Sequence, residues 1–362
     1  MTAAAVEPAA ASGSGSGSGS DPGHVRVLTR SRRRTWAALA AALLLLAVVV
    51  VASLALGARS VPIGEVLPAL LDPDPANNDH TVVSALRLPR TLIGLLAGSA
   101  LAVAGALMQG LTRNPLADPG LLGVNAGASL AVVVAVTLAG VTRPAGYVWF
   151  ALGGAALAAV VVHVIGSSGR QGGSPTSLAL AGAALTAGLT SLITVVVVRD
   201  VEAFDAYRFW VVGSLTARGT DAVVALAPFL GVGLLLAAAS ARALDLLALG
   251  ADTARGLGQH VAGGRALVMS AVVALSGGAT ALAGPIVFVG LVVPHLVRPL
   301  ARGDHRWLIA LSAPVGAALL LLADVLGRLI ARPGEVEAGL VVAFLGAPVM
   351  IALVQRARVV RP

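Results

Sequence analysis

The chain has 362 residues, of which 57% are hydrophobic and only 12% are charged, and its mean hydropathy is +0.91. Soluble domains carry roughly 25% charged residues, so the composition excludes an ordinary soluble protein. The formal net charge is +8, and all 25 basic residues are arginine. Because the chain has no lysine, a lysine-dependent phosphate loop is excluded. Because it has no cysteine, disulfides and thiolate metal sites are excluded.

Residues 1–34 form a polar N-terminal segment with a Ser-Gly run over residues 12–20. Such a composition cannot bury a core, so we expect a disordered cytoplasmic tail. Four arginines then precede the apolar run 35–56, which is long enough to cross a hydrocarbon core of about 30 Å as a helix. The run is too long for a signal peptide, which favours an uncleaved first span.

Nine further apolar segments predict an all-α polytopic membrane protein with about ten transmembrane helices over residues 35–356, followed by a cytoplasmic tail over residues 357–362. Their approximate bounds are 89–111, 119–140, 146–166, 177–198, 222–241, 266–284, 285–299, 307–326 and 337–354. Ten spans place both termini on one side of the membrane. Most of the arginines fall on that side, which predicts that both termini are cytoplasmic.

The segment 114–123 (NPLADPGLLG) interrupts the apolar pattern between the second and third spans. Pro115 is expected to stop the second span, Asp118 to cap the third, and Pro119 to stand in its first turn. Irregular backbone near a membrane is tolerated only where protein or water satisfies it. The segment is therefore either a constriction that lines a transport pathway or a tight corner between helices.

A second polar interruption covers residues 242–265, on the cytoplasmic side. Asp252 is expected to cap a short helix that begins at Thr253, and Gly256 and Gly258 are expected to end it. A short capped helix between arginines would make a rigid socket for a soluble partner. The alternative is an ordinary loop between helices.

An internal similarity links the two halves of the chain. Residues 98–105 and 277–284 match at five of eight positions, and the same offset places Pro115 on Pro294. The two segments would run in opposite directions, which predicts an inverted repeat.

Few ionisable residues lie deep in any span; Asp324 and Arg328, one turn apart, are expected to pair near the outer end of span nine. A charge at mid-membrane costs at least about 2.5 kcal/mol and usually marks an ion path. Their scarcity argues against an ion-coupled secondary transporter. An intramembrane enzyme would need clustered His, Asp or Glu residues, or a Ser/His pair, and the sequence shows none.

Five ordered segments resemble the permease subunits of type II ATP-binding cassette importers for iron-siderophores, haem and vitamin B12. These segments are 87–128, 247–258, 284–306, 320–328 and 345–354, and the resemblance covers most of residues 35–356. It implies a multi-pass subunit of the plasma (inner) membrane, most often for ferric siderophores, with cobalamin and haem as alternatives.

The resemblance also implies partners. Two ATP-binding cassette ATPases would bind the cytoplasmic side and carry ATP and Mg²⁺, while this chain would hold no cofactor, metal or catalytic residue. A second permease copy or a sibling permease would complete the pathway in the lipid bilayer. An extracytoplasmic substrate-binding protein or lipoprotein would deliver the substrate, and no nucleic acid would be involved.

Individual residues acquire roles from the same resemblance. Those expected to dock the ATPase are Leu249, Gly250, Asp252, Arg255, Leu257 and Gly258. Those expected to meet acidic groups of the binding protein are Arg87, Arg90 and Arg328, because arginine binds a carboxylate with two parallel hydrogen bonds. The expected pathway and gate residues are Asn114, Leu116, Pro175 and Thr176, although Pro175 replaces what is often a small hydroxyl residue.

Overall fold

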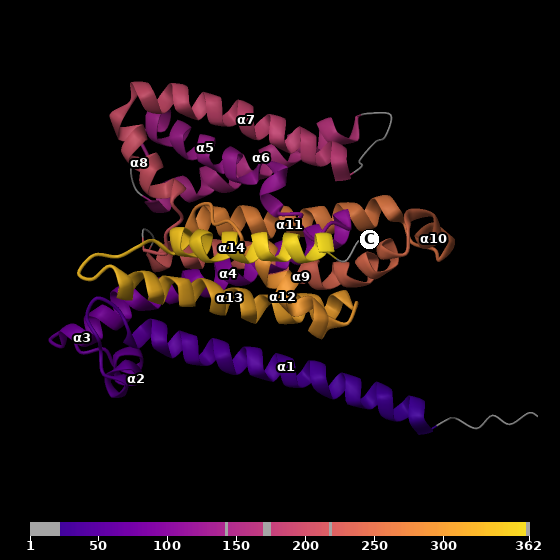
Figure 1. The fold of residues 1–362 in the computed structure, drawn as a ribbon. Helices are drawn as coiled ribbons and strands as arrows, with labels where there is room; N and C mark the ends of the chain where they lie inside the picture. Colours follow the sequence, from indigo (N-terminus) through magenta and orange to yellow (C-terminus); the bar gives the residue numbers. More distant parts are fainter. Residues whose placement is uncertain (1–21, 142–143, 169–174, 217–218, 360–362) are drawn as a thin grey trace, which may run out of the picture.

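The computed structural model describes residues 22–141, 144–168, 175–216 and 219–359, and within these ranges the regular structure is helical, as predicted (Figure 1). Seven helices are long and apolar enough to cross a membrane. Three shorter apolar helices are Val124–Ala139, Val289–Ala301 and Ala338–Ala352. Together these helices correspond to the ten predicted spans.

The ten helices that correspond to spans are α1 (Pro22–Ala55), α4 (Leu88–Thr112), α5 (Val124–Ala139), α6 (Pro144–Ser167), α7 (Pro175–Arg199), α9 (Thr220–Ala248), α11 (Val261–Ala283), α12 (Val289–Ala301), α13 (His305–Ile330) and α14 (Ala338–Val359). Short elements connect them: α2 (Ile63–Leu71), α3 (Asn78–Thr81), the π-helix η1 (Val82–Arg87), the 3₁₀ helix η2 (Pro119–Leu122), α8 (Val201–Val211) and α10 (Ala251–Gly256).

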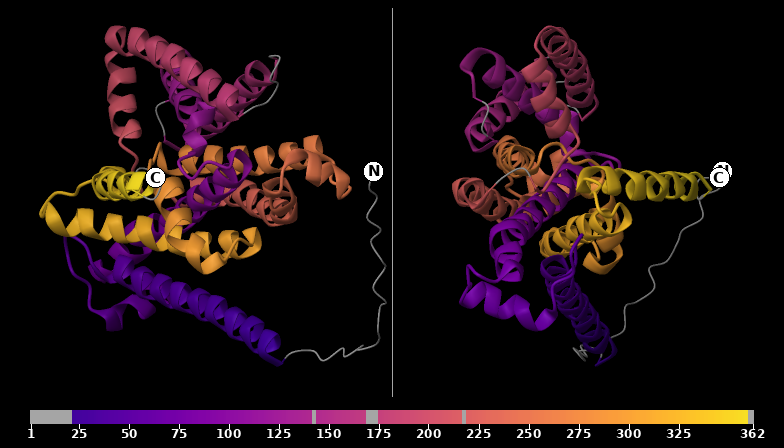
Figure 2. Two further views of the ribbon diagram at one scale, coloured as in Figure 1. Left: turned by 45° about the vertical axis from the view of Figure 1, so that its right-hand side comes forward. Right: turned by 90° about the vertical axis from the view of Figure 1, so that its left-hand side faces the viewer.

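Helix α4 lies in the middle of the bundle, where it packs against α13, α11, α12 and α9. The helices α5, α6, α7 and α8 form a second group on one side of α11, and α1 lies on the opposite side of the bundle against α13 (Figures 1 and 2). The short helices α2 and α3 lie at one end of the bundle and α10 lies at the other (Figure 1).

Small residues set the distance between α4 and its neighbours. A Cβ atom at Gly98 would stand 2.6 Å from the carbonyl oxygen of Gly316 in α13. Gly105 meets the backbone of Gly290 in α12 even more closely. Small residues let helix backbones touch, which is how helices associate where lipid removes the hydrophobic driving force. The positions of α12 and α13 therefore depend on α4 having no side chains at these points.

The two predicted tails are shorter than expected. Helix α1 begins at Pro22, so residues 22–34 of the predicted N-terminal tail are helical. Helix α14 continues to Val359, into the predicted C-terminal tail. Arginine is a good helix former, and extending an existing helix is easier than starting one, so charged residues next to a span can continue it. The predicted tail residues 1–21 and 360–362 lie outside the described residues.

Two of the predicted spans begin later in the chain than expected. The third span begins at Val124 rather than at residue 119, because residues 119–122 form a separate 3₁₀ helix that ends at Gly123 (φ 70°). The eighth begins at Val289 rather than at residue 285, because Gly284 (φ 77°) and Phe288 (φ 69°) both have positive φ. Such conformations are not helical, so they delay the start of the next helix. The inverted repeat stays a prediction.

We expect Gly105→Ala to lower the melting temperature of the detergent-solubilised protein. The added methyl group meets the backbone of Gly290 and forces α12 away from α4, and overpacking of this kind costs about 1–3 kcal/mol. Gly188→Ala in α7 is the matched control, because a Cβ atom there meets nothing within 4 Å and alanine favours a helix. Equal melting temperatures for the two variants would contradict the role given to Gly105.

Candidate functional site

The loop between α9 and α11 is a compact turn built around the short helix α10. Gly250 (φ 112°) turns the chain out of α9, and Gly258 (φ 80°) turns it away from α10; other residues would be strained at both points. The predicted helix is confirmed, but the predicted cap was wrong. The helix begins at Ala251 directly after Gly250, so Asp252 lies inside its first turn, where the helix dipole favours a carboxylate.

Helix α10 is fixed to the bundle on one side. Ala254 is fully buried in an apolar cluster with Leu247 and Val261, and its carbonyl accepts a hydrogen bond of 2.9 Å from the backbone N–H of Gln259. The fixed helix therefore has a defined position relative to α9 and α11.

Exposed side chains surround this fixed helix. Leu249, two residues before the helical stretch, and Leu257, directly after it, are 61% and 60% exposed. Asp252 and Arg255 form an exposed ion pair of 2.5 Å between them. Two exposed leucines at the ends of a rigid, charged turn form an apolar and polar surface that a partner protein can cover.

Contacts at the base of α10 join three long helices. Arg113, at the end of α4, donates a hydrogen bond to the carbonyl of Leu247 in α9. Asp245 of α9 accepts a hydrogen bond of 3.1 Å from the backbone N–H of His305, and its carboxylate lies 2.6 Å from Nδ1 of that ring. The ends of α4, α9 and α13 therefore meet beneath the α10 loop. The Asp245–His305 contact was not predicted, because 60 residues separate the pair.

The predicted break between α4 and α5 is present at this end of the bundle. Arg113 (φ 52°) ends α4 before Pro115, and Oδ1 of Asn114 accepts a hydrogen bond of 2.9 Å from the backbone N–H of Leu116. Asp118 caps a helix, but that helix is η2 and not the predicted third span: its Oδ1 accepts a hydrogen bond of 2.7 Å from Gly120 N–H, whereas α5 begins after Gly123. Asn114 and Leu116 are exposed.

The start of α7 lies beside this break. Gly182 of α7 approaches the carbonyl of Leu121 in η2, so η2 packs against the first turns of α7. Helix α7 begins at Pro175. The side chains of Pro175 and Thr176 lie outside the described residues, so no contact between them and the break is described.

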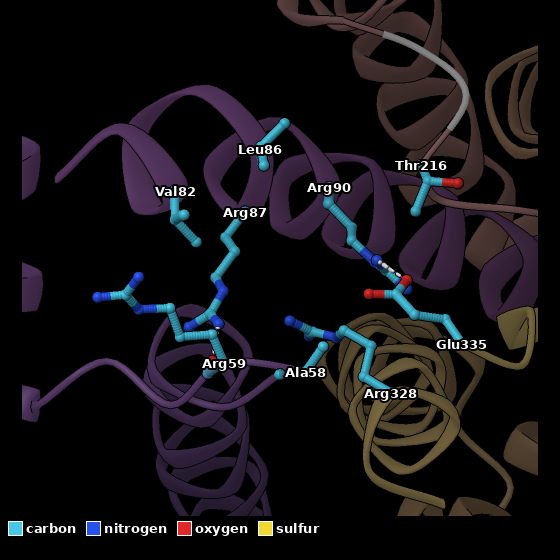
Figure 3. A pocket seen from close by; sticks show the side chains of 10 residues that line it. Ala58, Arg59, Val82, Leu86, Arg87, Arg90, Thr216, Arg328 and Glu335 are labelled. Atoms are coloured by element: carbon cyan, nitrogen blue, oxygen red, sulfur yellow. Dashed lines mark hydrogen bonds and ion pairs between the residues drawn. The ribbon is translucent and has the colours of Figure 1, made fainter. Parts of the chain in front are cut away.

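At the opposite end of the bundle, Arg87, Arg90 and Arg328 line one cavity of about 350 Å³ (Figure 3). The three arginines are separated in the sequence and come from η1, α4 and α13. The remaining lining residues are Gly57, Ala58, Arg59, Val82, Leu86, Thr216 and Glu335. We call this space the arginine cavity.

Two of these arginines bind the end of α1. Arg87 donates to the carbonyl of Leu54 at 2.7 Å and to that of Arg59. Arg328 donates to the carbonyls of Ser53 and Leu56 at 2.9 and 2.8 Å. The last carbonyls of a helix have no partner within the helix, and cations are favoured beside them. The arginines therefore hold the end of α1 against α4 and α13.

A buried ion cluster joins α4 to α13. Asp324 is fully buried and lies 2.7 Å from Arg90 and 2.9 Å from Arg328, which confirms the predicted Asp324–Arg328 pair. Arg90 also contacts Glu335 at 2.5 Å, as the dashed lines in Figure 3 show. Each buried charge has opposite partners, which is the condition under which charges are tolerated away from water.

Burial limits what these arginines can contact. Arg87 and Arg90 are each 6% exposed and Arg328 is 2% exposed, whereas the side chain of Arg59 is 62% exposed and extends away from the other three (Figure 3). Neither Arg59 nor Glu335 was predicted to belong to this site. Glu335 contacts Arg90 although 245 residues separate the two in the sequence, and no local pattern indicates such a contact. No group of three or more His, Asp or Glu side chains among the described residues could hold a metal ion.

Apolar helices of membrane length, with polar surfaces at both ends of the bundle, define a multi-pass membrane protein. The chain belongs to the FecCD transport family, whose family model matches residues 44–356.

Relatives in this family include the ferric enterobactin transport system permease protein FepD of Escherichia coli (strain K12). It is 47% identical over 305 residues, which cover 84% of this chain and 90% of the relative. The Fe(3+)-citrate import system permease protein YfmD of Bacillus subtilis (strain 168) is 42% identical over 84% of this chain and 90% of its own length. A solved inward-facing conformation of a putative metal-chelate type ABC transporter superposes with a TM-score of 0.77 at 27% identity, covering 88% of this chain and 98% of that one.

We expect Asp324→Asn to destabilise the protein by about 3–5 kcal/mol, because it leaves two buried arginines without their shared counter-ion. Asp205→Asn is the control, since the half-exposed Asp205–Arg208 pair contributes at most about 1 kcal/mol. Thermal unfolding in detergent measures both variants. A change no larger than that of the control would show that the cluster is not what joins α4 to α13.

Proposed function

We propose that this chain is the permease subunit of an ATP-driven importer of ferric siderophores. The observation that carries the proposal is the rigid α10 loop with exposed Leu249 and Leu257, in a chain whose relatives include permeases for ferric enterobactin and Fe(3+)-citrate. The chain would form the transport pathway and couple it to ATPases on other chains. Because the sequence has no lysine, it has no phosphate-loop lysine of its own.

The proposed orientation places both termini and α10 in the cytoplasm. Ten spans return the chain to its starting side, and most arginines lie at the end of the bundle that carries α10, as expected for cytoplasmic segments. The arginine cavity then faces the outside of the plasma membrane. Two ATP-binding cassette subunits would bind at the α10 loop, and a second permease, identical or a sibling, would complete the pathway.

The docking surface for the ATPase comprises Leu249, Gly250, Asp252, Arg255, Leu257 and Gly258. In this proposal the leucines supply the apolar contact, the two glycines fix the turn, and the Asp252–Arg255 pair supplies polar contacts. A displacement of α10 would reach Asn114 and Leu116 through the contact between Arg113 and Leu247. Those residues, with Pro175 and Thr176 at the start of α7, form the proposed cytoplasmic gate.

The extracytoplasmic binding protein or lipoprotein would dock at the arginine cavity. Because Arg87, Arg90 and Arg328 are buried, a carboxylate of the partner has to enter the cavity to reach them. There it would compete with Glu335, the acidic residue that lines the cavity and already occupies one side of Arg90. Arg59, exposed at the edge, would be the first arginine that the partner meets.

The substrate proposal is tested by uptake of radiolabelled ferric siderophores, haem and cobalamin into cells with and without the gene. We expect the deletion to abolish uptake of a ferric siderophore alone, and the intact gene to restore it. Loss of haem or cobalamin uptake instead would keep the importer and replace its substrate. Uptake that survives loss of the partner ATPases would contradict an ATP-driven permease and favour a secondary transporter.

We expect Leu257→Asp to prevent the ATPase from copurifying with the permease. Replacing an exposed interface leucine by a charge removes a contact worth about 2 kcal/mol at a hot spot, which weakens the complex roughly thirtyfold. Leu257→Met keeps an apolar side chain at the same position and should retain the complex. Unchanged copurification with Leu257→Asp would place the docking surface elsewhere.

We expect Glu335→Gln to strengthen binding of the purified binding protein about two- to fivefold, because a partly exposed ion pair worth up to about 1 kcal/mol no longer competes for Arg90. Binding to the permease in nanodiscs measures this effect. Asp79→Asn, which removes the partner of exposed Arg59 while leaving Arg90 paired, is the comparison. Weaker binding by Glu335→Gln would show that Glu335 supports docking and does not compete with it.

A further inference from the structure

Helix α2 is apolar on both its buried and its exposed faces. Val66 and Ala69 are buried against the protein, whereas Ile63, Leu67 and Leu71 are 70%, 62% and 77% exposed. Residues four apart are neighbours on a helix, so the three exposed side chains form one stripe. A helix that is apolar all round is normally covered all round. The stripe therefore needs a cover that no other part of the described chain supplies.

The depth of α2 follows from its buried face. Val66 and Ala69 belong to the same apolar cluster as Leu54 and Ala55, the last turn of α1. The part of α1 that can span the membrane, Arg33–Ala55, has 23 residues. At 1.5 Å per residue it is about 34 Å long, which slightly exceeds the thickness of a hydrocarbon core of about 30 Å. Helix α2 therefore lies level with the point where α1 reaches the membrane surface.

The stripe also lies beside a surface that faces lipid. Leu44 and Val48 of α1 are 68% and 58% exposed, and only 22% of the most apolar stretch of α1 is buried inside the protein. Figures 1 and 2 both place α2 next to the end of α1 at the edge of the bundle, away from α11 and α9. The exposed leucines of α2 thus continue the lipid-facing surface of α1.

We propose that α2 lies in the interfacial region of one leaflet, with Ile63, Leu67 and Leu71 inserted among the lipids. Helices that lie at the membrane interface insert their apolar side chains at the boundary between the headgroups and the acyl chains. The polar contacts of α2 fit this arrangement. Glu65 contacts Nε2 of His80 at 3.1 Å, Nδ1 of His80 accepts from Asp74 N–H at 3.0 Å, and exposed Asp72 follows the helix directly.

The proposed lipid contact has a consequence for the arginine cavity. The buried face of α2 packs in one cluster with Val83 of η1, and η1 ends at Arg87, which lines the cavity. Lipid contact at α2 would therefore fix the height of the cavity above the membrane. That the leaflet is the outer one rests on the orientation proposed above; the contact with lipid does not.

The absence of cysteine from the sequence makes a direct test possible. Single variants Leu67→Cys and Leu71→Cys are spin-labelled in the full chain in lipid nanodiscs, and collision with oxygen, which dissolves in lipid, is compared with collision with a water-soluble nickel chelate. Leu44→Cys in α1 is the lipid reference and Asp72→Cys is the water reference. We expect the oxygen-to-nickel ratio at positions 67 and 71 to exceed that at position 72 at least threefold.

Ratios at positions 67 and 71 equal to that at position 72 would overturn the proposal, because the stripe would then face water. Shielding from both reagents would overturn it too, because another protein or a second copy of the chain would then cover the stripe. The four cysteine substitutions replace exposed side chains, so we expect the melting temperature to stay near that of the unmodified chain. Neither substrate nor ATPase enters the measurement, so its failure is distinct from failure of the importer proposal.

Discussion

The close backbone contact of α4 with α12 and α13 is the constraint on which both ends of the molecule depend. Lipid gives little hydrophobic drive for helices to associate, so contact at Gly98 and Gly105 takes its place. The same helix carries Arg90 in the arginine cavity and is followed at its other end by Arg113, beneath α10. Close-packed elements transmit displacement instead of absorbing it. A single rigid helix thus links the two surfaces at which partners are proposed to bind.

The distribution of charge is consistent with a transporter whose energy is supplied by other protein chains. An ion-coupled carrier needs an ionisable group in the membrane that can change its partner, and such groups are usually found facing a pathway. Asp324 is buried and held between Arg90 and Arg328, so it acts as a structural counter-ion. The energy for a conformational change then has to arrive at a surface, and the exposed leucines around α10 offer one.

Local patterns in the sequence predicted what depends on neighbouring residues. Ten apolar helices and the Asp324–Arg328 pair are features of short segments, and the structure contains them. Contacts across the fold left no such pattern. The pairing of Arg90 with Glu335 depends on helix packing over 245 residues, and the exposed stripe of α2 was missed because nine residues are too few for a span. The roles assigned to the docking residues came from family resemblance, not from spacing.

Coupling between the two ends of the pathway requires α10 and the break after α4 to move as one unit, and distances between spin labels test this directly. Labels at Thr253→Cys and Leu116→Cys are measured in the assembled transporter, without nucleotide and with ATP bound. We expect the distance between the two labels within one chain to stay the same, while the distance between the Leu116 positions of the two permeases changes. A change in the distance between positions 253 and 116 within one chain, with no change at the break, would contradict it.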